Sequence, residues 1–150
     1  MEWRRDPYSI STDRDRLDHA GIHAFLRESY WSPGIPREVV DRSIRGSLPF
    51  GVYDGPRQVG FARVITDSAT YAYLADVYIL PSHRGRGLAR WLMEVVHSHP
   101  ELQGLRRWML VTRDAQGLYR RVGWREVEDC SRFMEIVDRD VYARSARRDA

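Results

Sequence analysis

The hydrophobic pattern of this chain changes repeatedly between two periods, and the changes predict an order of strands and helices. Short runs of apolar or alternating residues, bounded by glycine, proline or aspartate, are typical of β-strands. The predicted strands are residues 8–11, 48–53, 59–65, 71–79, 107–112, 124–127 and 133–137. Apolar residues that recur every three or four positions predict helices instead. The predicted helices run from a cap at Asp13 or Asp15 to about Glu28, and over residues 36–45, 88–98 and 115–122.

This order of elements, β-α-α-β-β-β-α-β-α-β-β, predicts an α/β (α+β) fold. We expect a mixed sheet of about six or seven strands, flanked by about four helices. The helix at 88–98 joins the strand at 71–79 to the strand at 107–112, and a crossover of that kind makes two strands parallel. The last two predicted strands would form an antiparallel pair.

Length and composition fit one domain. One hundred and fifty residues, of which 43% are hydrophobic, can build a single core. We expect one domain over residues 1–150, with its core at about 8–137 and a basic tail at 143–150. The first residues are charged, unlike those of a signal peptide, and no run of about 18 apolar residues exists, so no membrane partner is expected. The lone Cys130 cannot form an internal disulfide, which favours a cytoplasmic location.

The most specific chemistry lies where the strand at 71–79 passes into the helix at 88–98. The intervening loop contains Gly85 and Gly87 together with two arginines, Arg84 and Arg86. A helix N-terminus presents unpaired N–H groups and a partial positive charge, and glycine lets an anion approach the backbone closely. The loop therefore predicts a phosphate or pyrophosphate site. It lacks the Lys-Ser/Thr ending of nucleotide hydrolases and the third glycine of dinucleotide folds.

Two motifs of the chain, one in this loop and one about 30 residues after it, resemble those of the GNAT N-acetyltransferase superfamily. Arg84-x-x-Gly87-x-Ala89 is similar to the (Arg/Gln)-x-x-Gly-x-(Gly/Ala) motif that grips the pyrophosphate of acetyl-CoA in that family. Residues 118–124, Leu-Tyr-Arg-Arg-Val-Gly-Trp, resemble the aliphatic-Tyr-x-x-x-Gly-Phe segment that closes the cofactor site. The resemblance covers about residues 8–137. It implies the GNAT fold, in which the parallel fourth and fifth strands splay apart to receive the pantetheine arm.

The resemblance also implies roles for individual residues. Acetyl-CoA would be the acetyl donor, and Tyr119 would be the acid that protonates the departing thiolate. Thr112 stands where family members often carry asparagine, and its hydroxyl can still bond to the pantetheine. The expected cofactor-binding residues are Val77, Tyr78, Ile79, Arg84, Gly85, Arg86, Gly87, Leu88, Ala89 and Thr112.

The general base is less clearly indicated. Asp76 lies in the apolar strand at 71–79, beside the backbone expected to contact the cofactor. A partly desolvated carboxylate there can relay a proton through water. It can equally be a structural carboxylate bonded to a neighbouring strand or helix. Deprotonation of the amine by solvent, without a dedicated residue, is a third reading.

The acceptor side is indicated only by position. In proteins of this fold, the loop at 30–36 and the start of the second helix form the acceptor wall. Tyr30, Trp31, Arg37 and Glu38 are therefore the candidate substrate-binding residues. Such a wall could take a small-molecule amine or a peptide amine, and the sequence does not choose between them.

The favoured function is an N-acetyltransferase that moves an acetyl group from acetyl-CoA to a primary amine by direct attack in a ternary complex. The alternative is a catalytically idle CoA-binding or regulatory module. The net charge is +3, and its positive side is carried wholly by arginine. No nucleic acid partner is expected. His19 and His23 share one helical face without a third ligand, so no metal is expected either. A homodimer is compatible with a fold of this size.

Overall fold

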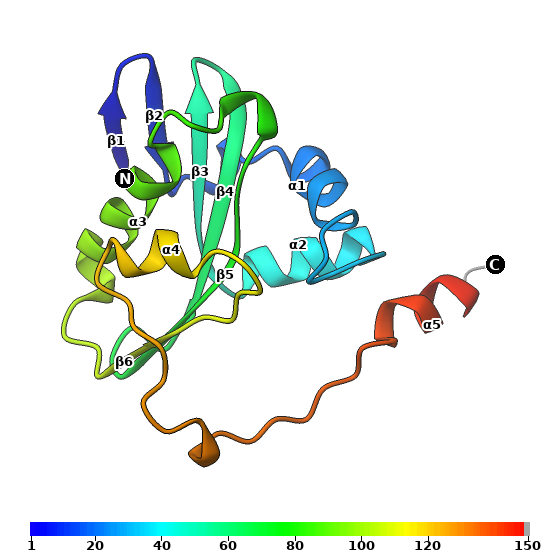
Figure 1. Cartoon of the computed structure of the whole chain (residues 1–150). Coiled ribbons are helices and arrows are strands. Elements are labelled where there is room, and N and C mark those ends of the chain that lie inside the picture. Colours follow the sequence, from blue (N-terminus) through cyan, green and yellow to red (C-terminus); the bar gives the residue numbers. More distant parts are fainter. Residues whose placement is uncertain (149–150) are drawn as a thin grey trace.

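This computed structural model describes residues 1–148. Its centre is a six-stranded sheet (Figure 1). Its strands follow one another in the sheet in the same order as in the sequence. They are β1 (Glu2–Arg5), β2 (Tyr8–Ser11), β3 (Leu48–Asp54), β4 (Arg57–Thr66), β5 (Tyr71–Ile79) and β6 (Arg107–Met109). Neighbouring strands are antiparallel except β5 and β6, which are parallel. The mixed sheet and the parallel crossover are thus confirmed.

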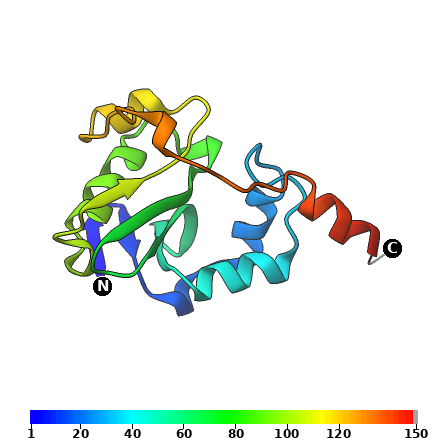
Figure 2. The same ribbon diagram turned by 90° about the horizontal axis from the view of Figure 1, so that it is seen from below.

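Helices cover both faces of this sheet (Figure 2). They are α1 (His19–Leu26), α2 (Arg37–Arg45), α3 (Leu88–Ser98), α4 (Gln116–Arg120) and α5 (Val141–Arg148). One apolar cluster joins α1 and α2 to Phe61 and Tyr78 of the sheet. A second cluster packs the apolar stripe of α3, with Leu92 and Val96 fully buried, against the opposite face. Burial of these two stripes fixes the helices on which the site is built.

The pairing of β5 with β6 is short, and this opens a wedge in the sheet. Only Tyr71, Ala72 and Tyr73 pair with β6, opposite Arg107 to Met109. Beyond Tyr73, β5 continues to Ile79 and stays paired with β4 alone. One edge of β5 therefore has no strand partner over residues 74–79. The splay of the two parallel strands agrees with the fold that the resemblance implies.

The first predicted helix is interrupted, which corrects the sequence reading. Asp13 caps only a 3-10 turn at Arg14–Arg16, and the α-helix begins after Asp18. The Asp18 carboxylate accepts a hydrogen bond from Gly21 N–H at 2.9 Å, so this later cap sets the start of α1. Pro36 is the N-cap of α2 and not its first residue.

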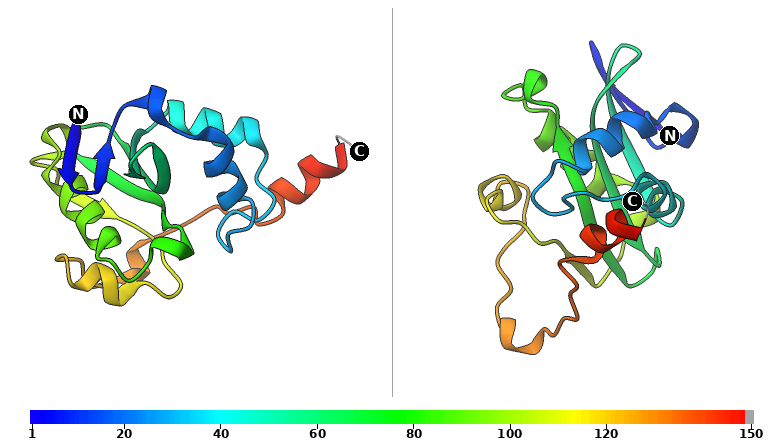
Figure 3. Two further views of the ribbon diagram at one scale, coloured as in Figure 1. Left: turned by 90° about the horizontal axis from the view of Figure 1, so that it is seen from above. Right: turned by 90° about the vertical axis from the view of Figure 1, so that its right-hand side faces the viewer.

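The C-terminal strand pair was predicted wrongly. Residues 124–127 and 133–137 form no strands, and the chain instead makes a 3-10 turn at Cys130–Arg132 and continues to α5. A strand pair needs a neighbouring strand and a face to bury. The neighbour here, β6, is only three residues long, and Figure 3 shows the chain passing away from the sheet as an open loop.

Two further elements were missed by the sequence reading. β1 carries three charged residues among its four, so its pattern gives no strand signal, yet it pairs along its whole length with β2. No helix was predicted in the basic tail at 143–150. Its residues up to 148 belong to α5, and residues 149–150 lie outside the described residues.

Candidate active site

Two glycines give the loop between β5 and α3 its shape. Gly85 and Gly87 have φ values of 75° and 76°, in the left-handed region that other residues rarely adopt. Gly87 is the N-cap of α3, and because glycine has no side chain, no side-chain hydrogen bond caps this helix. A Cβ at either position would meet no atom within 4 Å. The loop backbone therefore faces open space at the N-terminus of an 11-residue helix.

The N–H groups of this loop have no acceptors of their own. The first backbone N–H of α3 that bonds within the chain is that of Trp91, to the Gly87 carbonyl at 3.0 Å. Within residues 1–148, no acceptor is bonded to any N–H of residues 85–90. Such a run of free donors at a helix N-terminus suits an anion with several oxygens. A pyrophosphate is an anion of this kind.

Side chains around the loop hold it in place. His83 is buried, with Nδ1 2.8 Å from Ser82 Oγ and Nε2 3.2 Å from an Asp54 carboxylate oxygen. Arg84 Nε donates to the Ile79 carbonyl at 3.0 Å, and Arg86 donates to the Tyr8 hydroxyl at 2.6 Å. These contacts make the loop a preformed element. The anchoring role of His83 has no signal in the sequence, because its partner Asp54 lies 29 residues away.

The loop lies at the end of the unpaired edge of β5. Ile79 and Tyr78 pair with Gly60 and Phe61 of β4, which leaves their other edge open to the wedge. The Tyr78 ring stacks on Phe25 of α1, with ring centroids 3.7 Å apart, and burial raises the pKa of its hydroxyl. Its side chain thus belongs to the α1 face. What β5 offers to the wedge over Val77, Tyr78 and Ile79 is backbone.

Tyr119 lies on α4, on the other side of the wedge. Its ring is buried and packs against Trp124, with centroids 5.9 Å apart. Burial, with a smaller contribution from the Tyr30 phenol, raises the pKa of the Tyr119 hydroxyl to about 12. The hydroxyl therefore keeps its proton throughout the neutral range.

Thr112 holds the turn that leads into α4. Its Oγ1 accepts a hydrogen bond from Ala115 N–H at 3.0 Å, and its carbonyl accepts one from the Gln116 side chain at 3.3 Å. The hydroxyl proton is still available for another acceptor. The predicted contact of Thr112 with the pantetheine stays a prediction, and the structure adds a local structural role.

Asp76 is held by two side chains. Arg63 Nε on β4 donates to one carboxylate oxygen at 2.5 Å, and Trp31 Nε1 donates to the other at 3.0 Å. The residue has φ +55°, and the β4–β5 register shifts between Phe61 and Arg63. This pairing with the neighbouring strand is the structural arrangement that the sequence left open as one reading. The role of Asp76 as a base stays a prediction.

Of the four predicted acceptor residues, two lie at the wedge. Trp31 reaches Asp76, and the Tyr30 hydroxyl accepts a hydrogen bond from Arg113 N–H at 3.0 Å. The Arg113 guanidinium also lies 3.9 Å from the Tyr30 ring centroid. The loop between α1 and α2 is thereby joined to the loop between β6 and α4. No sequence signal predicts this contact, because it joins residues 83 positions apart.

The other two predicted acceptor residues are on α2. Arg37 Nε donates to Asp41 on the same helix at 3.0 Å, and Glu38 lies in the first turn. Neither contacts Asp76 or Tyr119 in the structure, and their role in binding the acceptor stays a prediction. The Asp41 carboxylate also accepts a hydrogen bond from His19 at 2.7 Å. The hydrogen bond from His19, together with the one from Arg37, lowers the pKa of the Asp41 carboxyl.

No group of three or more His, Cys, Asp or Glu side chains within residues 1–148 could hold a metal ion. None of the helices described has the length and apolar composition needed to cross a membrane.

Comparison with known proteins identifies the family. The acetyltransferase (GNAT) domain model matches residues 45–126. A protein of Gibberella zeae that is provisionally named an acetyltransferase is 36% identical over 142 residues, covering 79% of each chain. The crystal structure of a GNAT-family protein from Xanthomonas campestris pv. campestris is 47% identical, with a TM-score of 0.88 over 91% of this chain and 96% of that one. This chain belongs to the GNAT family and is an acyltransferase.

A more distant structure shares the fold alone. The aminoglycoside N-acetyltransferase AAC(6')-Iy, solved in complex with a bisubstrate analogue, CoA-S-monomethyl-acetylneamine, is 22% identical to this chain. It superposes with a TM-score of 0.65 over 88% of this chain and 98% of its own.

Proposed function

We propose that this chain moves an acetyl group from acetyl-CoA to a primary amine, by direct attack of the amine within a ternary complex. The observation that carries the proposal is the run of unpartnered N–H groups at residues 85–90, located where the unpaired edge of β5 ends. The N–H groups and the unpaired strand edge lie end to end, as the pyrophosphate and the pantetheine of acetyl-CoA do. Related folds solved with CoA-containing ligands support the same assignment.

The donor would lie along the backbone. The pyrophosphate would accept hydrogen bonds from the loop and the start of α3, from Arg84 to Ala89, and the pantetheine amides would bond to the free edge of β5 at Val77, Tyr78 and Ile79. The Thr112 hydroxyl, which follows β6 in the chain, would bond to the pantetheine from the opposite side of the wedge. An N–H on the same strand edge is also the simplest donor to the carbonyl oxygen as it gains negative charge.

The transfer itself makes one bond and breaks one. The amine nitrogen attacks the thioester carbon, the C–S bond breaks, and the proton lost by nitrogen balances the proton gained by sulfur. The Tyr119 hydroxyl, protonated at neutral pH, donates a hydrogen bond to the departing sulfur. Its pKa lies well above the value of about 8.5 typical of a thiol. The hydroxyl therefore stabilises the thiolate as a donor, and it regains any transferred proton readily.

The amine must lose a proton before it attacks, because a lysine-like ammonium has a pKa of about 10. Asp76 is the candidate that would relay this proton through water. Its oxygens each hold one donor, from Arg63 and from Trp31, and each has a further lone pair for a water molecule. Solvent alone is the competing route.

The acceptor would be a small-molecule or peptide amine bound against Tyr30 and Trp31. Both rings are about 40% exposed, so they present apolar surface and a π-face to a cationic ligand. The bisubstrate analogue bound to AAC(6')-Iy carries an amine-derived acceptor of this general kind.

A free-thiol assay with acetyl-CoA and a panel of amines tests the proposal. The panel should contain polyamines, amino acids, aminoglycosides and peptide N-termini. The proposal predicts thiol release that depends on at least one amine. Binding of acetyl-CoA without thiol release from any amine would contradict transfer and support an idle CoA-binding module.

A further inference from the structure

Arg113 is held in place by Tyr30, while the donors of its own side chain are unused. Its backbone N–H donates to the Tyr30 hydroxyl at 3.0 Å, and its guanidinium lies 3.9 Å from the centroid of the Tyr30 ring. The Arg113 side chain is 65% exposed. Within residues 1–148, the N–H groups of this guanidinium donate no hydrogen bond. A stacked, planar fork of donors without acceptors suits a carboxylate.

The neighbouring Asp114 does not satisfy this guanidinium. The shortest distance between their nitrogen and oxygen atoms is 3.7 Å, whereas a charge-assisted hydrogen bond spans about 2.7–2.9 Å. Both side chains are exposed to solvent, so their attraction is weak. Other arginines around the wedge already have bonded acceptors: Arg63 bonds to Asp76, Arg84 to the Ile79 carbonyl, Arg86 to Tyr8 and Arg120 to Glu126. Arg113 differs from them because its donors are left for a ligand.

Contacts link Arg113 to Asp76 through two aromatic rings. Trp31 Nε1 donates to the Asp76 carboxylate at 3.0 Å, and the Trp31 and Tyr30 rings meet edge to face with centroids 5.1 Å apart. The series of contacts therefore begins at a carboxylate, passes over two rings and ends at a guanidinium. Groups of opposite charge lie at the two ends of one aromatic surface. A ligand with an amine at one end and a carboxylate at the other complements both.

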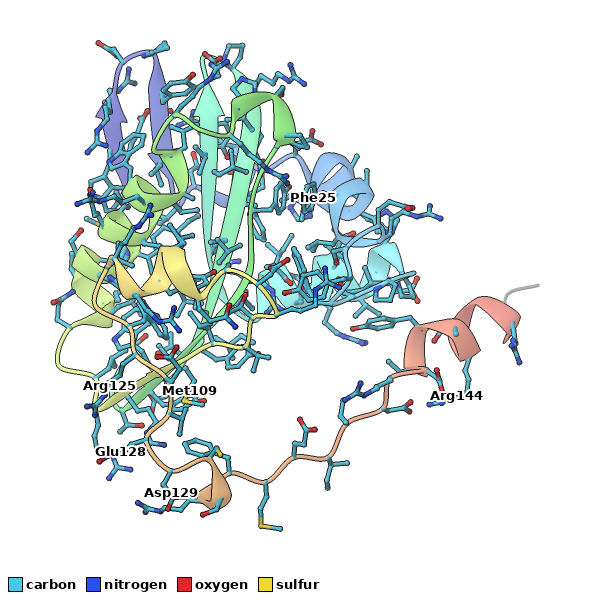
Figure 4. The ribbon with its side chains drawn as sticks, viewed as in Figure 1. Phe25, Met109, Arg125, Glu128, Asp129 and Arg144 are labelled. Atoms are coloured by element: carbon cyan, nitrogen blue, oxygen red, sulfur yellow. The ribbon has the colours of Figure 1, made fainter. Side chains whose placement is uncertain are left out.

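This aromatic surface is preformed and lies near the proposed acid. Phe25 of α1, which Figure 4 shows beside the sheet, stacks on Tyr78 at 3.7 Å and lies 6.4 Å from the Trp31 ring. Burial, and to a smaller extent the Tyr30 phenol, raises the pKa of the Tyr119 hydroxyl, so Tyr30 lies near Tyr119. A surface that is already ordered orients a ligand at a smaller cost in entropy.

The charge over Tyr30 disfavours a polycation. The face of an aromatic ring attracts cations, but over Tyr30 that position holds the Arg113 guanidinium. A second ammonium group, such as a polyamine or an aminoglycoside carries, would meet a like charge there. A carboxylate would instead accept two parallel N–H···O bonds from the guanidinium.

We propose that the acetyl acceptor is an amine that also carries a carboxylate, as an amino acid or a short peptide does, and that Arg113 binds this carboxylate. The Trp31 ring and Asp76 then lie on the side of the amine. The carboxylate takes no part in the bond changes, so Arg113 is a residue that determines specificity. This inference deepens the proposed acetyl transfer and rests on it.

Paired acceptors test the role of Arg113. Each pair is an acid and its own carboxamide: glycine, β-alanine, γ-aminobutyrate and diglycine, each assayed with acetyl-CoA by thiol release. The quantity compared is the ratio of kcat/KM for the acid to kcat/KM for the amide. In Arg113→Gln this ratio should fall by about tenfold or more for at least one pair, because the charged hydrogen bonds are lost. The pair with the largest fall distinguishes a free amino acid from a peptide.

Two further variants separate the contact from its charge. Arg113→Lys keeps the charge without the planar fork, so it should retain only part of the preference for the acid. Arg121→Gln is the matched control, since Arg121 is an exposed arginine at the C-cap of α4 and its loss removes the same charge. It should leave the ratio as in the wild type. Calorimetry should give the same affinity for acetyl-CoA in all three variants.

Failure of this inference can be told from failure of acetyl transfer. Thiol release with an acid-to-amide ratio that Arg113→Gln leaves unchanged would overturn the inference alone. Thiol release from no acceptor would contradict the transfer itself, and binding then decides the role of Arg113. The N-acetylated acids, titrated into the CoA-saturated chain, should bind about tenfold more weakly to Arg113→Gln. Equal affinity in wild type and variant would overturn the assignment of Arg113.

Discussion

The proposed donor and acceptor sides of the wedge are built from different kinds of group: main chain on one side and side chains on the other. On the proposed donor side, the groups that would face a ligand are backbone N–H groups at residues 85–90 and the free edge of β5. No N–H group of residues 85–90 has an acceptor among the described residues. On the acceptor side they are side chains that already contact one another, as Trp31 contacts Asp76 and Tyr30 contacts Arg113.

This difference decides what each side can do. A site made of backbone accepts one shape of ligand and changes little with side-chain substitution, apart from its glycines. A site made of paired side chains adapts its specificity residue by residue, and each contact in it contributes to stability as well as binding. Substitutions on the proposed donor side should therefore change ligand binding without changing stability. Substitutions on the proposed acceptor side should change both together.

The largest expected effect comes from Tyr119→Phe. Removing the hydroxyl deletes the donor to the departing sulfur, so kcat should fall by about 100-fold or more. The affinity for acetyl-CoA, measured by calorimetry, should stay within about twofold, because the proposed cofactor contacts are with backbone. Equal turnover in variant and parent would remove Tyr119 from its assigned role.

Tyr53→Phe is the matched control. Tyr53 is also fully buried, its pKa is raised to about 12 by burial, and its hydroxyl has no hydrogen-bond partner within residues 1–148. Its removal should leave turnover unchanged and stability equal or slightly higher.

Asp76→Asn should couple binding with stability. Asparagine tolerates the left-handed backbone at this position but removes the charge that pairs with Arg63. The two side chains are only 9% and 15% exposed, so the unpaired guanidinium should lower the free energy of unfolding by about 2 kcal/mol. KM for the amine should rise by about tenfold, since Trp31 loses its charged acceptor. Steady-state kinetics and urea unfolding measure the two quantities.

Asp41→Asn is the control on the same side. It breaks an ion pair with Arg37 whose side chains are much more exposed, so the loss should stay below about 1 kcal/mol. A larger loss than that of Asp76→Asn would contradict the view that Asp76 anchors the acceptor wall.

Thr112→Val should have a smaller effect, confined to α4. The methyl group cannot accept the hydrogen bond from Ala115 N–H, and loss of one such hydrogen bond costs about 1 kcal/mol. Thr112→Ser keeps the oxygen and should stay close to wild type. Thermal unfolding measures both, and equal melting temperatures in the two variants would contradict the role of Thr112 in holding the turn before α4.

The smallest expected effect is a pH dependence of stability. Burial lowers the pKa of His97, and Trp124 Nε1 donates to its Nε2 at 3.0 Å, which requires the neutral ring. A folded-state pKa below the ordinary value of 6.5 gives stability that is complete above about pH 6.5 and falls as the pH decreases.

His97→Gln tests this by removing one titrating group. The drop in melting temperature between pH 7.5 and pH 5.5, two values chosen on either side of about 6.5, should be smaller in the variant. A residual drop is expected from His99, whose pKa is also lowered by burial. An unchanged drop would exclude His97 as a source of the pH dependence.

The sequence predicts the strand, loop and helix of the proposed donor side well because their signals are local. β5 and α3 have the predicted bounds, and Gly85 and Gly87 between them have the left-handed backbone that glycine favours. The start of α1 was misplaced because three aspartates within six residues compete as caps, and only Asp18 closes an α-helical turn.

The acceptor side and the C-terminus depend on partners that local patterns do not specify. The contacts of Trp31 with Asp76 and of Tyr30 with Arg113 join residues 45 and 83 positions apart. Residues 133–137 have a strand pattern, and that pattern is correct about their composition. What the pattern cannot supply is a strand to pair with, since the hydrogen bonds of a strand come from its neighbour, and residues 133–137 have no such neighbour among the described residues.

Calorimetric titration of acetyl-CoA into Gly87→Val, with Gly104→Val as control, tests the central claim most directly. Both glycines have left-handed backbone and open space around them, so both substitutions impose similar strain. The account predicts that Gly87→Val weakens binding by about 100-fold or more, because the side chain blocks the approach to the N–H groups, while Gly104→Val binds like wild type. Unchanged affinity in Gly87→Val would contradict the donor site.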